Sequence, residues 1–295
     1  MAISKLKKGQ IKALKDEYDK LRLGKEALLA LLDEVEIPEN VYNSNAIENS
    51  TLTLKETEKI LLELEVSRDI SLREVFEAKN LARVISYKKN KVHDGKLDKE
   101  SILLLHQMLI GGIDDEISGR FRRVGEYVRV GTHIAPLPEQ VEKTIDDLLF
   151  DYENDYLSYP LDKIANFHLG FETIHPFCDG NGRIGRVLIN YQLLQFGFPR
   201  IIIRDKEKKD YYQAFSDFRI NKTTKTMEKV LLLAVQESLN KRIAYLKGQT
   251  IVSLADYVKE HDLSLSSLIN AARRQNIPAF REKGIWKIGA DFKYV

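Results

Sequence analysis

The sequence is poor in cysteine, and it contains no long apolar run. A single cysteine among 295 residues permits no disulfide within the chain, which fits a reducing compartment and predicts a cytoplasmic protein. The longest apolar runs, such as residues 230–235, are too short to cross a bilayer. Residues 1–10 lack the apolar segment of a signal peptide. We therefore expect no membrane partner.

A strong charge imbalance is also missing. Lys and Arg number 46 and Asp and Glu number 44, so the net charge of +2 indicates neither nucleic acid nor membrane as a bulk partner. The hydrophobic fraction of 43% suits a globular protein, and 295 residues are enough for one large domain or two smaller ones.

Most of the chain shows apolar residues at helical spacing, which predicts a mainly α fold. One long amphipathic helix is expected over 8–34, ending before a break at Pro38. Asp98 or Ser101 is expected to cap a later helix. Glycines and β-prone residues over 119–136 predict a short hairpin. The further expected helices cover 38–49, 55–65, 71–91, 97–110, 138–152, 160–174, 210–219 and 222–248.

Candidate functional residues are most concentrated in residues 175–186, whose sequence is His-Pro-Phe-Cys-Asp-Gly-Asn-Gly-Arg-Ile-Gly-Arg. His175 has a side-chain pKa suited to accepting a proton near neutral pH. Asp179 is a candidate Mg2+ ligand, since Mg2+ prefers one or two carboxylates together with phosphate oxygens. Arg183 and Arg186 are three residues apart and share one helical face.

The glycines of this segment predict an anion site. Gly180, Gly182 and Gly185 let the backbone turn tightly, and the amides of 180–183 can point into one concavity. Helical spacing follows directly, so the loop opens onto a helix N-terminus that favours phosphate. Together these features indicate transfer chemistry on a nucleotide phosphate. They do not identify the phosphorus that is attacked or the nucleophile.

The segment resembles the core motif of the Fic family, H-P-F-x-D-G-N-G-R-x-x-R, at every specified position. The resemblance covers roughly residues 10–245. It implies a Fic-type helical bundle with a small β-hairpin flap, and Mg2+-dependent transfer of AMP from ATP to a hydroxyl of a protein. The acceptor would be a Ser, Thr or Tyr of a target protein or of the chain itself.

The same resemblance assigns roles within the motif. His175 would deprotonate the acceptor hydroxyl, Asp179 would hold Mg2+, and Phe177 would anchor the loop. The residues that would cradle or bind the phosphates are Gly180, Asn181, Gly182, Arg183 and Arg186.

Upstream, Ser44-Asn-Ala-Ile-Glu-Asn49 resembles the inhibitory helix that one class of the family carries at its N-terminus. Ser44 and Glu48 are four apart and so share a helical face. The resemblance implies that Glu48 pairs with Arg186 and competes there with the γ-phosphate of ATP. Some relatives also remove AMP with this glutamate, which leaves a second activity open.

The resemblance places a flap over 119–136 and an adenosine contact further on. Arg120 and Arg122 would be structural, and Tyr211, with Tyr212 beside it, matches the tyrosine that contacts adenosine. An exposed strand of the flap could align an extended target segment through main-chain bonds. The flap residues expected against the nucleotide are Val130, Gly131, Thr132 and His133.

From residue 250 onward the long helical pattern gives way to shorter predicted elements. Two helices, at 253–259 and 264–275, precede a β-hairpin within 277–295, and this order resembles a winged-helix module. Arg273 and Arg274 would face DNA if the second helix entered a major groove. A module for packing, dimerisation or target binding is the other interpretation. We expect three parts: an N-terminal helical region over 1–95 with the inhibitory helix at about 39–49, a catalytic core over 96–248, and the module over 250–295.

Three alternatives remain beside the transferase. The chain could be a DNA-binding regulator whose core senses a nucleotide, or an enzyme with another phosphate-diester donor, against which the intact Asp179, Arg183 and Arg186 argue. The spacing of His168, Glu172 and His175 could be taken for a zinc site, but it departs from H-E-x-x-H and Pro176 follows directly. Cys178 occupies a variable position of the motif and is expected to be a bystander.

Overall fold

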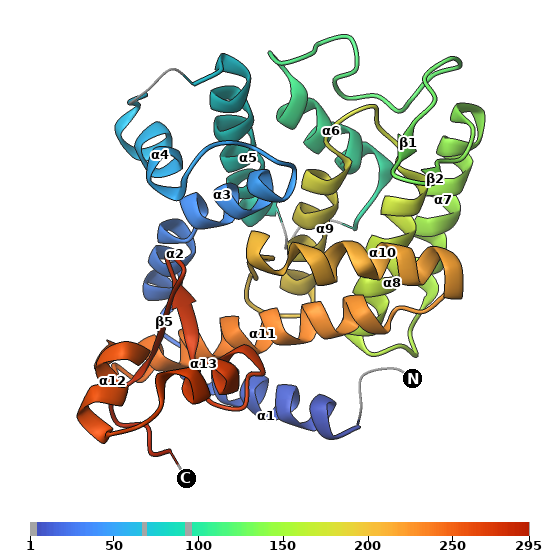
Figure 1. Ribbon diagram of the computed structural model, residues 1–295. Coiled ribbons are helices and arrows are strands. Elements are labelled where there is room, and N and C mark those ends of the chain that lie inside the picture. Colours follow the sequence, from blue (N-terminus) through green and yellow to red (C-terminus); the bar gives the residue numbers. More distant parts are fainter. Residues whose placement is uncertain (1–4, 67–69, 92–95, 295) are drawn as a thin grey trace.

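The computed structural model describes residues 5–66, 70–91 and 96–294, and these are mainly helical, as the sequence predicts. The helices form a bundle with a small mixed module beneath it (Figure 1). The N-terminal helices are α1 (Lys5–Leu21), α2 (Glu26–Val35), α3 (Ile37–Ile47), α4 (Leu54–Glu58) with its π-helical continuation η1 (Lys59–Glu63), and α5 (Leu72–Lys91). The later helices are α6 (Lys99–Ile110), α7 (Pro138–Asn154), α8 (Pro160–Ile174), α9 (Asn181–Gln195), the 3-10 turn η2 (Asp205–Glu207), α10 (Lys208–Asn221) and α11 (Lys225–Leu246).

The single helix expected over 8–34 is wrong, because the chain leaves the helix after Leu21 and re-enters it at Glu26. Gly24 lies in this break with φ +73, a conformation that glycine adopts without steric cost. The break that the sequence predicts at Pro38 lies close to the observed one, since α2 ends at Val35 and α3 begins at Ile37. Pro38 lies in the first turn of α3, where its missing N–H has no helical partner to lose.

Two helix starts show how local chemistry sets the boundaries. The Thr53 side chain accepts from the amide of Glu56, whose carboxylate accepts from the Thr53 amide, and this capping box begins α4. Asp98 accepts from the amide of Ser101 and caps α6, so Asp98 is the cap of the two candidates.

The hairpin is shorter than expected. β1 (Arg129–Val130) pairs antiparallel with β2 (His133–Ile134) around Gly131, which has φ +61. The segment before it is fixed by side chains instead. Arg120 forms an ion pair with Glu126 at 2.6 Å, and the Arg122 guanidinium donates to several backbone carbonyls, including that of Pro136 at 2.9 Å.

Two apolar cores hold the bundle together, and α3 contributes to both. Val41 packs with α5, α6, α8 and α9, whereas Ile47 packs with α1, α8, α10 and α11. The helix that the sequence assigns an inhibitory role therefore lies between the two cores. The N-terminal helices share these cores with the later helices rather than forming one of their own.

The C-terminal module has its own small core, which includes Leu254, Tyr257, Leu268 and Ile288. Its elements are β3 (Ile251–Ser253), α12 (Leu254–His261), α13 (Leu265–Arg273), β4 (Phe280–Glu282) and β5 (Ile285–Gly289). The sheet has the order β3-β5-β4, so it contains one strand more than the expected hairpin. The winged-helix assignment stays a prediction. None of the described helices is both long and apolar enough to cross a membrane.

Candidate active site

His175 directly follows α8 and is held in a left-handed conformation. Its φ is +49 and its amide donates to the Phe171 carbonyl at 2.9 Å, which closes the last turn of the helix. Pro176 prevents the helix from continuing. Arg122 Nε donates to the His175 carbonyl at 2.8 Å, so the backbone is fixed on both sides of the imidazole.

The imidazole of His175 is neutral at physiological pH. Burial lowers its pKa to about 4, because the charged form is poorly solvated there. Its Nδ1 lies 3.8 Å from Glu172 Oε2, and burial, reinforced by the charge of Glu48, raises the pKa of Glu172 to about 8. Nδ1 has no hydrogen-bond partner among the described residues. A neutral imidazole of this kind can accept a proton.

A stacked pair of rings supports the loop that follows. Phe177 is fully buried and stacks on His106 with ring centroids 3.7 Å apart. His106 Nε2 lies 3.0 Å from the Asp179 carbonyl, and its Nδ1 accepts from the Gly119 amide at 3.1 Å. The imidazole thus joins the flap segment to the loop, and Phe177 packs as an anchor.

The loop ends at the N-terminus of α9. Gly180 has φ +81 and precedes the helix, so the amides of its first turn have no partner within the helix. The Asn181 side chain turns back and bonds both the amide and the carbonyl of Phe177, which leaves its backbone to face an anion. A Cβ added to Gly182 would lie 2.2 Å from Glu48 Oε1, so this close approach requires glycine.

Asp179 presents an ionised carboxylate beside these amides. Burial opposes ionisation, but the charge of Arg183 and the Gly180 amide lower its pKa. Oδ1 accepts from Gly180 at 2.6 Å and from Arg183 at 3.0 Å, and Oδ2 accepts from Arg73 of α5 at 2.5 Å. The carboxylate fits a magnesium ligand, because the ion would take the place of the exposed Arg73 guanidinium.

The two motif arginines contact different helices. Arg183 is buried against α5, where its Nη1 lies 3.2 Å from Glu77. Arg186 is buried against α3: its Nε donates to Ser44 Oγ at 2.9 Å and its Nη2 donates to the Ser44 carbonyl at 2.8 Å. The same Nη2 lies 2.8 Å from Glu48 Oε1. The guanidinium that would bind a phosphate is therefore already paired with a carboxylate.

The end of α3 is fastened by α10. Glu48 follows the last helical residue, and Asn49 turns the chain with φ +68. Asn49 Oδ1 accepts from Lys208 at 3.0 Å, and Tyr212 donates to the Ile47 carbonyl at 2.9 Å. These contacts hold Glu48 at its place on Arg186.

Tyr211, the expected adenosine contact, is buried in this structure. Its ring is 1% exposed, and its hydroxyl lies 2.9 Å from His168 Nε2 and 3.4 Å from Arg186 Nη1. The ring packs in the core and offers a nucleotide no surface. Tyr212 is partly exposed but bonds to α3.

The expected flap lies beside the end of α8, close to His175. His133 Nε2 is 2.8 Å from the carbonyl of Thr173, two residues before His175. Gly131 and Thr132 are exposed at the turn, and Val130 is half-buried. The position suits a strand edge that presents an acceptor to His175.

Sequence reasoning missed three residues of the site. Arg73 and Glu77 are four apart on α5 and look like an ordinary exposed helical ion pair, so nothing local points to Asp179 and Arg183. Glu172 entered as a zinc candidate, whereas the structure places it beside His175, the expected base. The described residues contain no group of three His, Cys, Asp or Glu arranged to hold a metal ion. Burial raises the pKa of the Cys178 thiol to about 11, so it stays protonated.

The structure thus places the free amides of a helix N-terminus close to a histidine in a helical bundle, the arrangement that the sequence predicts for a nucleotide-phosphate site. Residues 96–193 match the model of the Fic/DOC family, so this part of the chain is similar to that family. It is 32% identical over 180 residues to a protein adenylyltransferase Fic of Nematostella vectensis, covering 59% of this chain and 42% of the relative. It is also 32% identical over 179 residues to a protein adenylyltransferase fic-1 of Caenorhabditis elegans, covering 58% and 34%. The chain thus spans less than half the length of these relatives.

Solved structures share the fold. A Fic domain containing signaling protein from Bacteroides thetaiotaomicron superposes with a TM-score of 0.72 at 24% identity, covering 81% of this chain and 97% of that one. A Fic family protein from Desulfovibrio desulfuricans superposes with a TM-score of 0.69 at 22% identity, covering 100% and 99%. The second match includes the C-terminal module.

Proposed function

We propose that this chain transfers AMP from ATP to a hydroxyl side chain of a protein and is a nucleotidyltransferase. The observation that carries the proposal is a neutral, half-buried His175 next to the unpaired amides at the start of α9. The relatives' names, which specify adenylyltransferases, agree with this chemistry. The acceptor is a Ser, Thr or Tyr of a target protein or of the chain itself.

The reaction follows from the arrangement of these groups. The acceptor oxygen attacks the α-phosphorus, its proton passes to His175, and the bond to the β-phosphate oxygen breaks with release of pyrophosphate. The amides of residues 181–183 and the positive end of α9 stabilise the negative charge. Magnesium held by Asp179 would neutralise charge on the phosphates. Arg183 and Arg186 supply further positive charge.

The resting protein is inhibited by its own α3. Glu48 occupies Arg186, which a γ-phosphate would otherwise bind, and Ser44 takes two further donors of the same guanidinium. ATP can bind productively only when this carboxylate leaves, since both anions compete for one arginine. Regulation would then consist of moving α3.

Transfer of label from ATP carrying a marked α-phosphate tests the proposal. The chain, or a protein in a lysate, should become labelled when Glu48 is replaced by glycine. His175→Ala in that background should abolish labelling. His261→Ala, an exposed histidine of the C-terminal module, serves as the matched control and should leave it unchanged. Labelling that persists without His175 would remove it from the role of base.

A further inference from the structure

A cavity of about 960 Å3 lies between the helical bundle and the C-terminal module, away from the site described above. Its bundle side comes from α10 and α11 and its module side from α13 and the β4–β5 turn. Apolar side chains line it on both sides, among them Leu233 of α11, Ile269 of α13 and Trp286 of β5. The volume falls in the range of small-molecule sites.

The charges around this cavity are predominantly positive. Seven cations line it, Lys7 and Arg281 among them, and the other five form no ion pair in the described part of the chain: Lys206, Lys225, Lys229, Arg273 and Arg274.

Most of the carboxylates that line the cavity already have a partner within the protein. Arg281 pairs with Glu207 at 2.5 Å and with Glu237 at 2.6 Å, and Glu228 accepts from Thr224 at 2.5 Å. Asp210 is the further carboxylate of the lining. An apolar cavity with an excess of uncompensated cations favours an anion that carries an apolar body.

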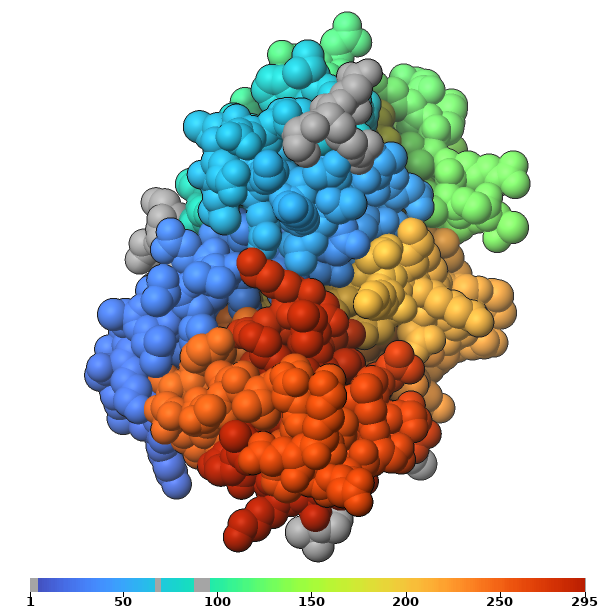
Figure 2. Space-filling model, turned by 60° about the vertical axis from the view of Figure 1, so that its left-hand side comes forward, coloured from blue at the N-terminus to red at the C-terminus, as the bar shows by residue number. Residues whose placement is uncertain are grey.

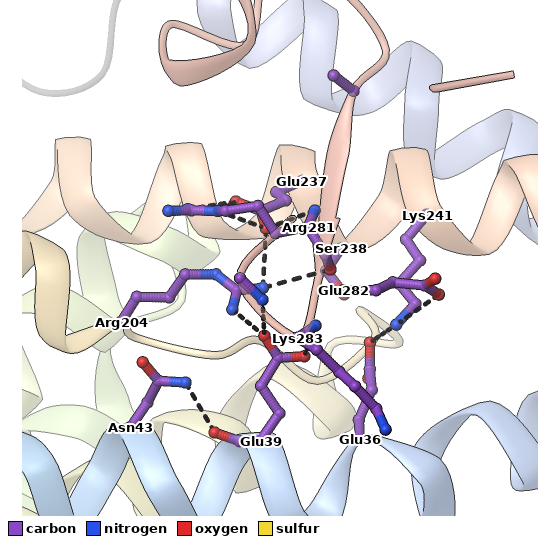
Figure 3. A network of polar contacts seen from close by, with 12 residues as sticks. Glu36, Glu39, Asn43, Arg204, Glu237, Ser238, Lys241, Arg281, Glu282 and Lys283 are labelled. Atoms are coloured by element: carbon purple, nitrogen blue, oxygen red, sulfur yellow. Dashed lines mark hydrogen bonds and ion pairs between the residues drawn. The ribbon is translucent and has the colours of Figure 1, made fainter. Parts of the chain in front are cut away.

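One wall of the cavity is a buried charge network that reaches α3. Glu237 accepts from Arg281 of β4 and, at 3.0 Å, from Arg204, which also forms an ion pair with Glu39 of α3. Glu39 in turn accepts from the amides of Lys283 at 3.1 Å and Gly284 at 3.2 Å (Figure 3). In Figure 2 the red β4–β5 hairpin reaches the light-blue N-terminal segment.

This network fixes α3 to the module. Glu39, Arg204 and Glu237 are all buried, and a buried charge that loses its partner is strongly destabilising. Glu39 lies on the same helix as Ser44, two turns before Glu48. A movement of the β4–β5 turn therefore changes the position of the helix that supplies the carboxylate on Arg186.

We propose that this cavity binds a small organic anion with an apolar body, and that its occupancy loosens α3. The anion would lie near Arg273 and Arg274 and compete with Glu207 and Glu237 for Arg281. Arg281 already stacks on Trp286, with 4.5 Å between its guanidinium carbon and the ring centroid, so an apolar body can pack beside it.

The linkage follows from the chain connectivity. Arg281, Lys283 and Gly284 are nearly consecutive, so drawing Arg281 toward the ligand shifts the amides that Glu39 accepts from. The effect on AMP transfer rests on the proposed function. Ligand binding and the loosening of α3 do not depend on the proposed function, and they are measured separately.

Binding is tested with anilinonaphthalene sulfonate, an aromatic anion whose fluorescence reports an apolar site. The full chain should bind it at one saturable site. Reversing both charges in Arg273→Glu/Arg274→Glu should weaken binding about tenfold or more, because the anion loses its charged partners. Lys259→Glu, an exposed lysine of the same module that does not line the cavity, should change it less than about twofold.

Two results would overturn the site. One is the lack of saturable binding, and the other is equal binding by the wild type and the double variant. Salt-sensitive binding of duplex DNA that the double variant loses, without any dye binding, would assign these arginines to nucleic acid instead.

Hydrogen exchange of α3 tests the linkage. Amides of residues 40–48 should exchange faster when the dye is bound, and Glu39→Gln should produce the same acceleration without dye. Exchange that is unchanged by the dye would contradict the linkage. Accelerated exchange without any AMP transfer would count against the proposed function and leave the cavity intact.

Discussion

The two ends of the loop at residues 175–186 are both in contact with residues from the N-terminal helices, but in different surroundings. At one end, Arg186 has a side chain that is 6% exposed and receives three contacts from α3. At the other end, Asp179 is 33% exposed and its partner Arg73, from α5, is 58% exposed. Glu48 itself is 37% exposed, so the difference lies in the buried arginine and its two further bonds to Ser44, whereas the other contact is a single exposed ion pair.

The difference indicates which contact sets the resting state. Exposed ion pairs contribute about 0–1 kcal/mol, so Arg73 can give way to a metal ion. A charge-assisted hydrogen bond to a buried arginine contributes about 1.5–3 kcal/mol. The α3 contact should therefore dominate inhibition, and the α5 contact should modulate metal binding.

The largest effect is expected from Glu48→Gly. Loss of about 1.5–3 kcal/mol of competition should raise AMP transfer roughly 10- to 100-fold, since 1.4 kcal/mol is tenfold. Initial rates of label transfer measure it. Glu48→Gln, which keeps the shape and removes the charge, should give an intermediate rise. If the glutamine variant equals the wild type, charge is not what holds Arg186.

A smaller effect is expected from Ser44→Ala. The variant loses the bond from Arg186 Nε but keeps the Ser44 carbonyl as an acceptor. One such bond contributes about 0.5–1.5 kcal/mol, which predicts a rise of about 2- to 10-fold. A rise as large as that of Glu48→Gly would show that α3 is held by Ser44 rather than by its glutamate.

Arg73→Ala tests the exposed ion pair between Arg73 and Asp179. Removing a competitor for Asp179 should lower the Mg2+ concentration for half-maximal transfer by at most about fivefold. The measurement is a magnesium titration in the Glu48→Gly background. Arg83→Ala, an exposed arginine on the same helix, should not change the titration. A shift much greater than fivefold would place Arg73 on a par with Glu48.

The contribution of His175 to the pH dependence should be weak in the neutral range. A His175 pKa of about 4, lowered from 6.5 by burial, keeps the imidazole neutral and able to accept a proton above that value. Protonation of His175 should therefore lower the rate near pH 4, and by itself it should change the rate less than about twofold between pH 8 and pH 6. Ring titration by NMR checks the assignment, and a midpoint near 6.5 would contradict it.

Local sequence predicted the loop well because its chemistry is contiguous. The stop at Pro176, the glycine turn and the start of α9 all follow from residues within twelve positions. The helix that carries Ser44 and Glu48 was identified from a family pattern, since a helical glutamate on its own shows no sign of its partner. Helices α8 and α11 were also placed closely by their apolar spacing.

The remaining contacts join residues that are far apart in the chain. Arg73 and Asp179 are 106 positions apart, and Glu39 meets the amide of Lys283 across 244 positions. Each of these side chains looks like a solvated surface charge in its own segment. The sharp turn at Gly24 was missed because apolar spacing continues on both sides of it, and β3 was missed because three residues show too little periodicity.

The most direct test of the central claim, that Glu48 on Arg186 withholds AMP transfer, is the intact mass of three proteins after incubation with ATP and Mg2+. These are the wild type, Glu48→Gly, and Glu48→Gly combined with Arg186→Ala. The single variant should gain AMP, the wild type should gain little, and the double variant should lose the gain. Equal addition of AMP to the wild type and to Glu48→Gly would contradict the account.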